Sequence, residues 1–338
     1  MPPQTVVPAD FAENASHLVQ AIDLKTGLAR LVRMASADYR DASFLDDRMF
    51  TGRFETTVVR WHEVVGATNP TMALDARWIF HIGHVGSTLI ARLLGELTLA
   101  VREPRALRDL AYAPRSVFDK DGEAMTRIYS RRLDRRNPTV VKATSFVSEI
   151  APALCPAGER ALFLYASPRA YMCTILAGEN SRKGLASLWP ERKQRLSGRA
   201  MLLGAEASEA HLAAAAWACE MTSLEAAAAA MPDRLISWMD FDSLLADMPT
   251  ALLQIVGFFG LEADLPTIHS IAMGPIMRRY SKAPEYDYSP DLRGDLLQQA
   301  EREYAPSIEA AIDMLFKAAE DSPLLGRALS RSSAITEL

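Results

Sequence analysis

The sequence predicts an α/β protein in three layers, with helices on both faces of a mostly parallel central sheet. The first observation is a set of short, continuous apolar runs, which are typical of strands buried on both faces. These runs occupy residues 77–82, 139–142, 160–166 and 234–239. The second observation is that helical patterns separate the runs, as in βαβ units. The chain has 338 residues, 49% of them hydrophobic, which is enough for one large domain with additions.

The chain is expected to divide into three regions. Residues 1–75 mix short helical patterns with a polar stretch and are expected to form an N-terminal helical cap. The α/β domain is expected over residues 76–320, and a C-terminal tail over residues 321–338.

Two helices and two loops stand out within the α/β domain. Residues 207–231 are alanine-rich, contain no glycine or proline and stop before Pro232, which predicts a long helix. Residues 248–261 have proline near the start and glycine near the end, which predicts a second helix. The basic segment 180–199 and the segment 278–295 are rich in turn residues, and both are expected to be loops over a site.

Composition and charge exclude several classes of protein. The net charge of −5 disfavours a nucleic-acid-binding protein, which needs a basic face. The three cysteines lie in apolar surroundings without CxxC spacing and are expected to be buried thiols rather than zinc ligands. No signal-peptide pattern and no run approaching the roughly 20 apolar residues of a membrane span are present. The expected location is therefore the cytoplasm.

The most informative stretch is "FHIGHVGSTLIARLLGEL", residues 80–97. It is typical of a strand end, a glycine turn and a helix, an arrangement that places backbone N–H groups and the positive end of the helix dipole around an anion. Gly83 and Gly86 permit positive φ and close approach of the backbone, and Ser87 and Thr88 add hydroxyl donors. An ordinary strand-to-helix turn is the alternative interpretation. A phosphate-binding loop is predicted over Gly83, His84, Val85, Gly86, Ser87 and Thr88.

The loop departs from the common nucleotide-hydrolase pattern. That pattern, GxxxxGK[ST], needs a lysine after its last glycine, and here Ser87 follows Gly86. No acidic residue ends the run 160–166 as a magnesium-binding aspartate would. ATP or GTP hydrolysis is therefore disfavoured, and no metal site is predicted.

The loop instead resembles the 5′-phosphosulfate loop of the sulfotransferases, whose fold is a P-loop variant of the three-layer α/β/α class. "HVGST" fits that loop at Gly86, Ser87 and Thr88, with His84 in place of the family's lysine. "RLISWMDFDSLLADMPTALLQIVGFFGL" is similar to the family's segment from "YEDL" to "FLGL". "TVVKATSF" is similar to its strand ending in lysine, threonine and histidine, with Lys142 at the lysine and Thr144 at the histidine base.

A second segment is similar to the family's motif for the donor's 3′-phosphate. In "LFLYASPRAYMCTILAGENSRKG" an apolar strand is followed by Ser-Pro-Arg and a helix. Strict spacing puts Ala166 at the family's arginine and Thr174 at its serine. Arg169 is therefore the candidate replacement for the arginine, and with Thr174 or Ser181 it would bind the 3′-phosphate. Lys282 lies in a loop similar to the family's C-terminal phosphate-binding segment. A solvated residue at a helix start is the alternative interpretation of Arg169.

The resemblance implies transfer of a sulfuryl group from 3′-phosphoadenosine 5′-phosphosulfate, as co-substrate and without a metal, to a hydroxyl or amine of a small-molecule, carbohydrate or lipid acceptor. His84 and Lys142 would offset charge on the transferring group, and Glu103 would be the general base. A surface carboxylate paired with a neighbouring arginine is the alternative interpretation of Glu103. Two other functions stay open: an ATP-dependent kinase-like enzyme, and a nucleotide-binding protein that has lost transfer activity. The sequence identifies neither the acceptor nor an oligomeric state.

Overall fold

A five-stranded parallel sheet lies at the centre of the protein. The computed structural model describes residues 6–50, 52, 54–133, 136–199, 208–281, 287 and 289–333. Its main sheet has the order β5-β6-β4-β7-β8, and each neighbouring pair of strands is parallel. The strands are β4 (Arg77–His81), β5 (Ala100–Arg102), β6 (Val140–Lys142), β7 (Arg160–Tyr165) and β8 (Leu235–Asp240).

Four of these strands coincide with the apolar runs of the sequence, so the predicted parallel sheet is confirmed. β5 was not predicted, because a three-residue strand carries too few residues to show a pattern. It pairs with β6 so that Arg102 lies opposite Lys142. This register brings the next residue, Glu103, beside Lys142.

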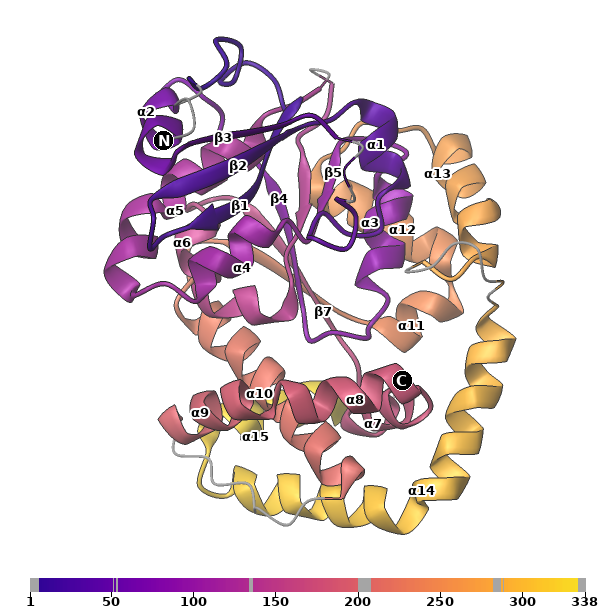
Figure 1. The fold of residues 1–338 in the computed structure, drawn as a ribbon. Helices are drawn as coiled ribbons and strands as arrows, with labels where there is room; N and C mark the ends of the chain where they lie inside the picture. The colour runs from indigo at the N-terminus through magenta and orange to yellow at the C-terminus, as the bar shows by residue number, and fades with distance from the viewer. Residues whose placement is uncertain are drawn as a thin grey trace.

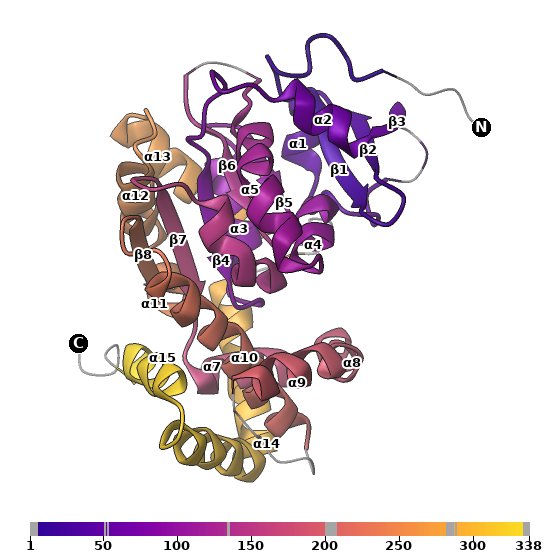
Figure 2. The same ribbon diagram turned by 90° about the vertical axis from the view of Figure 1, so that its left-hand side faces the viewer.

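Helices cover both faces of the sheet and complete the three-layer fold. Figure 1 shows α12 and α13 on one side of β4 and β7 and α4, α5 and α6 on the other, and Figure 2 shows the same separation. Helix α3, which follows β4, packs against β5, β6 and α12, whereas the 3₁₀ helix η1 packs against β4. These helices are α3 (Ser87–Leu94), α4 (Arg105–Ala111), α5 (Arg115–Ser130), η1 (Ser145–Ile150), α6 (Ala151–Leu154), α12 (Met248–Phe259) and α13 (Leu265–Ala272).

A second group of helices gathers beyond the end of β7 (Figures 1 and 2). Within this group, α7, α10 and α14 pack against one another, and α15 packs on α10 and α14. The predicted helices at 207–231 and 248–261 are confirmed as α10 and α12. The group consists of α7 (Pro168–Leu176), α8 (Glu179–Ser187), α9 (Trp189–Gly198), α10 (Glu209–Ala229), α14 (Pro290–Ala319) and α15 (Pro323–Ser333). Shorter elements, α11 (Phe241–Ala246) and η2 (Pro275–Arg278), follow β8 and α13.

The N-terminal region is a small antiparallel sheet rather than the expected helical cap. Strands β1 (His17–Asp23), β2 (Leu28–Arg33) and β3 (Thr56–Arg60) pair in that order, and the helices α1 (Ser36–Asp41) and α2 (Trp61–Ala67) are short. The turn between β1 and β2 contains Gly27 at φ 66°, a conformation that favours glycine. The apolar residues of this region are compatible with short strands as well as with helices. The helical pattern was therefore misleading, because the hairpin of β1 and β2 is completed by β3, a strand that lies farther along the chain.

The expected loop at residues 180–199 and the expected C-terminal tail both contain helices. Residues 180–187 belong to α8 and residues 189–198 to α9, because their arginine, lysine and glutamate residues favour helix and form i,i+4 pairs such as Glu179–Lys183 at 2.6 Å. The expected tail contains α15, whose Leu325, Ala328 and Leu329 form a buried face. The limits proposed for the domain, residues 76 and 320, stay a prediction.

The three cysteines lie in the interior of the protein. Cys155, Cys173 and Cys219 are free and buried, as the sequence predicts. Burial raises the pKa of the Cys155 thiol to about 12, so this thiol stays protonated near neutral pH. Among the described residues, no helix combines the length and the apolar character that crossing a bilayer requires.

The two sides of α14 differ sharply in burial, which gives a test of the fold. Leu315 is fully buried and the next residue, Phe316, is 54% exposed. Leu315→Ala should lower the free energy of unfolding by about 2–5 kcal/mol through loss of packing, whereas Phe316→Ala should change it by about 0.5 kcal/mol or less. Urea denaturation of the two variants measures both values. Equal losses would contradict the described orientation of α14.

Candidate functional site

The parallel sheet brings five chain segments to one edge. Because all five strands run in the same direction, the residues that follow them lie at the same end of the sheet, where α/β proteins bind ligands. The loop of residues 82–86 follows β4, Glu103 follows β5 and Phe241 follows β8. The candidate site is therefore built from residues far apart in sequence.

The loop after β4 has the conformation of an anion-binding turn. Gly83, His84 and Gly86 have φ values of 82°, 55° and 61°, and Gly86 caps the first turn of α3. In the described structure, the backbone N–H groups of residues 85–89 donate no hydrogen bond. Consecutive N–H groups at a helix N-terminus, next to left-handed residues, form a concave site for an anion. This geometry agrees with the phosphate-binding loop expected from the sequence.

A buried cluster of three side chains lies directly behind this loop. The ammonium group of Lys142 forms an ion pair with Glu103 and donates a hydrogen bond to Thr88 Oγ1 at 3.0 Å. Lys142 is 1% exposed. Burial lowers the pKa of the Lys142 ammonium from its ordinary value, and the carboxylate of Glu103 opposes this decrease. The cluster connects the loop to β5 and β6.

Glu103 is held in an unusual backbone conformation. Its φ is 51°, and among the described residues only His84 shares a positive φ without being glycine. Such conformations are costly and are concentrated at functional sites. The carboxylate also lies 3.6 Å from Arg48 Nη2 and 3.9 Å from His81 Nε2. Its partners are Lys142 and Arg48, not the neighbouring arginines considered from the sequence.

The buried His81 supports the loop from below. The N–H of Gly83 donates to His81 Nδ1 at 2.9 Å, so the ring carries its proton on Nε2, which donates to the carbonyl of Ala143 at 2.8 Å. His81 is 4% exposed, so this histidine belongs to the core.

A small cavity, here called the loop cavity, opens on the loop. Its volume is about 170 Å³. Residues 84–89 form one wall, Thr174 and Phe241 lie on others, and Arg279 and Arg293 supply positive charge. The ring of Phe241 packs so closely on Gly86 that a Cβ there would lie 1.9 Å from Cε2.

A larger cavity of about 650 Å³, here called the large cavity, shares His84 and Tyr280 with the loop cavity. Ser181 and Arg192 line it from the helical side, and the segment of residues 41–49 lines the opposite side. His84 and Tyr280 therefore lie where the two cavities meet.

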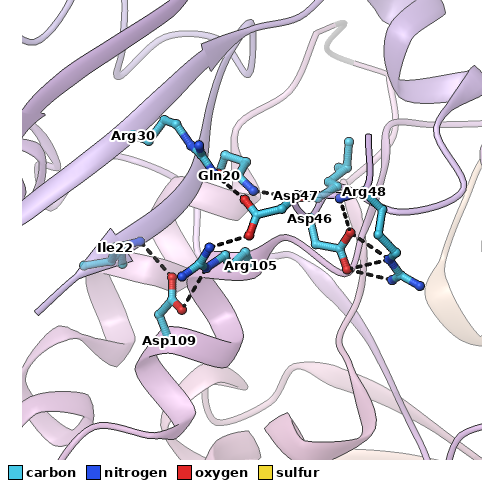
Figure 3. Close-up of polar contacts among 9 residues, drawn as sticks. Gln20, Ile22, Arg30, Asp46, Asp47, Arg48, Arg105 and Asp109 are labelled. Carbon is cyan, nitrogen blue, oxygen red and sulfur yellow. Dashed lines mark hydrogen bonds and ion pairs between the residues drawn. The ribbon is translucent and has the colours of Figure 1, made fainter. Parts of the chain in front are cut away.

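Ion pairs hold the segment of residues 41–49 in place (Figure 3). Asp47 forms ion pairs with Arg30 of β2, at 2.5 Å, and with Arg105 of α4. Arg48 pairs with Asp46 at 2.6 Å and stacks on Phe44, with its Cζ 3.7 Å from the ring centre. The small N-terminal sheet thus positions one wall of the large cavity.

Only some of the candidate residues for the 3′-phosphate line the two cavities. Thr174 lines the loop cavity and Ser181 the large cavity. Arg169 lines neither of the two cavities and forms ion pairs with Glu301 at 3.0 Å and Glu309 at 2.7 Å, both on α14. Lys282 lies outside the described residues.

Three residues of the site were missed in the sequence. Phe241 follows the run 234–239 directly, and its position at the end of a predicted parallel strand could have indicated it. Arg279 and Arg293 lie in the segment 278–295 that was expected to cover a site, but nothing in their spacing separates them from other surface arginines. Arg293 is ion-paired with Asp242 at 2.6 Å.

The fold and the site define a three-layer α/β protein in which a glycine-containing loop and a helix N-terminus follow the central strand. No protein-family model matches the chain, and no curated protein matches it. Among solved structures, the chain is similar to the sulfotransferase domain from the curacin biosynthetic pathway, with 12% identity and a TM-score of 0.39. The similarity covers 68% of this chain and 97% of that chain. It is too distant to assign an activity, which has to be inferred from the residues themselves.

The described residues also lack a cluster of three or more histidine, cysteine, aspartate or glutamate side chains placed to hold a metal ion.

The contact between Gly86 and Phe241 predicts an unequal response at two glycines of similar φ. Gly27→Ala should cost about 1–2 kcal/mol, the strain of a left-handed alanine, because nothing lies within 4 Å of its Cβ position. Gly86→Ala should cost about 1–3 kcal/mol more, since Phe241 must shift. Urea denaturation measures the difference. Similar costs at both positions would contradict the close contact, and adding Phe241→Ala should recover part of the loss at Gly86.

The ion pair between Lys142 and Glu103 predicts strong coupling. Lys142→Met leaves a largely buried carboxylate without its main partner and should lower the free energy of unfolding by about 3–5 kcal/mol. Adding Glu103→Gln removes the unpaired charge, so the double variant should be more stable than the sum of the single changes by about 0.5–3 kcal/mol. A double-mutant cycle in urea measures this term, and strict additivity would show that the two groups do not interact.

Proposed function

We propose that the protein is a sulfotransferase-like enzyme that binds 3′-phosphoadenosine 5′-phosphosulfate at the loop after β4 and transfers its sulfuryl group to an acceptor in the large cavity. The observation that carries the proposal is the run of backbone N–H groups at residues 85–89, which have no acceptor among the described residues and belong to residues that line the loop cavity. The similarity of "HVGST" to the 5′-phosphosulfate loop supports this choice of anion.

The phosphosulfate end of the donor would bind at the loop. The N–H groups, with Ser87 and Thr88, would bind the phosphate oxygens, and Lys142 would contribute its charge through Thr88. The loop cavity of about 170 Å³ is smaller than the roughly 300–1,000 Å³ of most ligand sites. Binding of the adenosine end therefore requires side chains such as Phe241, Leu296 and Leu297 to move.

The junction of the cavities suits an in-line transfer. A bond forms between the acceptor oxygen or nitrogen and sulfur while the bond between sulfur and the bridging oxygen breaks, and the proton of the acceptor passes to a base. His84 lines both cavities and stands at the position of the family's lysine, so it would contact the bridging oxygen as negative charge develops there. Glu103 remains the proposed base; it lines neither cavity itself, and Arg48, which lies 3.6 Å from its carboxylate, lines the large cavity.

A nucleotide-binding protein without transfer activity is the second candidate. One observation favours it: carboxylates already neutralise Lys142 and Arg169, two cations that the sequence assigns to the donor. Both candidates predict binding of the donor's nucleotide, but only the first predicts transfer.

The decisive experiment is a thermal-shift titration with 3′,5′-adenosine bisphosphate, with AMP and magnesium-ATP as controls. A ligand that binds only the folded state stabilises it by about 2.7 kcal/mol at 100 times its Kd. We expect a dose-dependent rise in Tm with the bisphosphate and a smaller one or none with AMP. A rise with magnesium-ATP alone would favour a kinase-like enzyme, and no rise with any nucleotide would contradict both candidates.

Two variants identify the cation that binds the 3′-phosphate in the same assay. Arg293 lines the loop cavity, so Arg293→Ala should weaken binding of the bisphosphate by about 1.5–3 kcal/mol, and binding of AMP much less. Arg169→Ala is the matched control on the neighbouring helix. A loss with Arg169→Ala and none with Arg293→Ala would return the role to the residue chosen from the sequence.

A further inference from the structure

The large cavity combines an apolar wall with positive charge. The charged side chains in its lining are two arginines, Arg48 and Arg192, and one carboxylate, Asp41, beside neutral polar groups such as Asn180 and Ser181. Its apolar side chains are Phe44, Met49, Ile175, Leu185 and Leu188. Such a surface favours an amphipathic ligand over a strongly polar one.

The two arginines differ in how many hydrogen bonds and ion pairs their guanidinium groups form. Arg48 is held by both oxygens of Asp46 and lies 3.6 Å from Glu103, and its side chain is largely exposed. Arg192 is 7% exposed and takes part in no hydrogen bond among the described residues, with its Nε buried and unsatisfied. A buried guanidinium without hydrogen bonds is costly, so its presence in a cavity wall calls for a partner.

The only carboxylate paired with Arg192 in the described structure is a poor partner. Glu220 of α10 lies 3.7 Å away, from Oε1 to Nε, and is fully buried, with both oxygens lacking hydrogen bonds. Burial raises the pKa of the Glu220 carboxyl from its ordinary value, and the positive charge of Arg192 opposes this increase. The next carboxylate, Glu149, is engaged by Arg199, lies 3.6 Å from Arg195 and accepts a hydrogen bond from Ser223. Arg192 therefore lines the large cavity with two weak contacts to its charge among the described residues, Glu220 at 3.7 Å and the ring of Phe146, whose centre lies 5.6 Å from the Arg192 Cζ.

We propose that the large cavity binds a small amphipathic carboxylate whose anionic group pairs with Arg192 and whose apolar part lies against Phe44 and Leu188. Calling this ligand the acceptor rests on the function proposed above, because His84 connects the cavity to the loop. Its hydroxyl or amine would then lie toward His84, at the end of the cavity that adjoins the loop cavity.

The test uses a series of 4-hydroxyphenyl carboxylic acids and their methyl esters, with binding followed by ligand-observed NMR on the full chain. Each pair differs in charge and hardly in shape. The acids should bind at least ten times more tightly than their esters, and Arg192→Gln should remove this preference while leaving binding of the esters unchanged. Equal binding of acids and esters to the unmodified protein, or failure of every acid to bind at millimolar concentration, would overturn the proposal.

Glu220→Gln is the variant that separates recognition from folding. It removes the competing carboxylate and keeps Arg192, so it should maintain or increase the preference for acids. A purely structural role of Arg192 predicts instead that Glu220→Gln and Arg192→Gln weaken acids and esters alike, which would overturn the proposal even if Arg192→Gln folds poorly.

The assay contains no sulfuryl donor, so its result is independent of the proposed transfer. Binding of acids through Arg192, without binding of 3′,5′-adenosine bisphosphate, would support the proposed carboxylate site in the large cavity. It would also exclude the proposed sulfotransferase function. Binding of the bisphosphate without any preference for acids would leave both functions proposed above in place and exclude this class of acceptor.

Discussion

Parallel pairing of five short strands is the constraint from which the candidate site follows. It forces the residues after each strand to one edge, so a glycine turn, a glutamate and a phenylalanine from distant parts of the chain meet there. The register between β5 and β6 then places Glu103 beside Lys142, and the hydrogen bond from Lys142 to Thr88 connects this pair to α3. One slip in that register would separate the buried charges.

The conformation of the loop has to meet two structural requirements at once. Its backbone N–H groups must stay exposed to a cavity, which needs left-handed residues, while the surrounding side chains must remain packed. His81 satisfies the second requirement below the loop by accepting from Gly83, and Phe241 does so above it by covering Gly86. The same cover reduces the volume available to a ligand, so the loop is protected when no anion is bound.

Much of the central fold could be predicted from the sequence because continuous apolar runs and proline- or glycine-bounded helices are local signals. The N-terminal sheet could not, since β2 pairs with β3 across more than twenty intervening residues whose pattern is also compatible with helix. The loop of residues 83–88 was predicted from its local glycine pattern, whereas the contact of Glu103 with Lys142 was not, because it depends on β5, a strand that the sequence does not reveal. The partners of Arg169 and Arg192 could not be predicted either, because both depend on helices that the sequence cannot place relative to the sheet.

The two halves of α14 are attached to the protein by different forces. Its second half buries Ile308, Ala311 and Leu315, whereas its first turns, which border the loop cavity, combine the packing of Leu297 with an ion pair between Arg293 and Asp242. Dissolved ions screen charge pairs that reach solvent but leave apolar contacts intact or strengthen them. Ionic strength therefore acts more on the end of α14 that borders the loop cavity than on its buried second half.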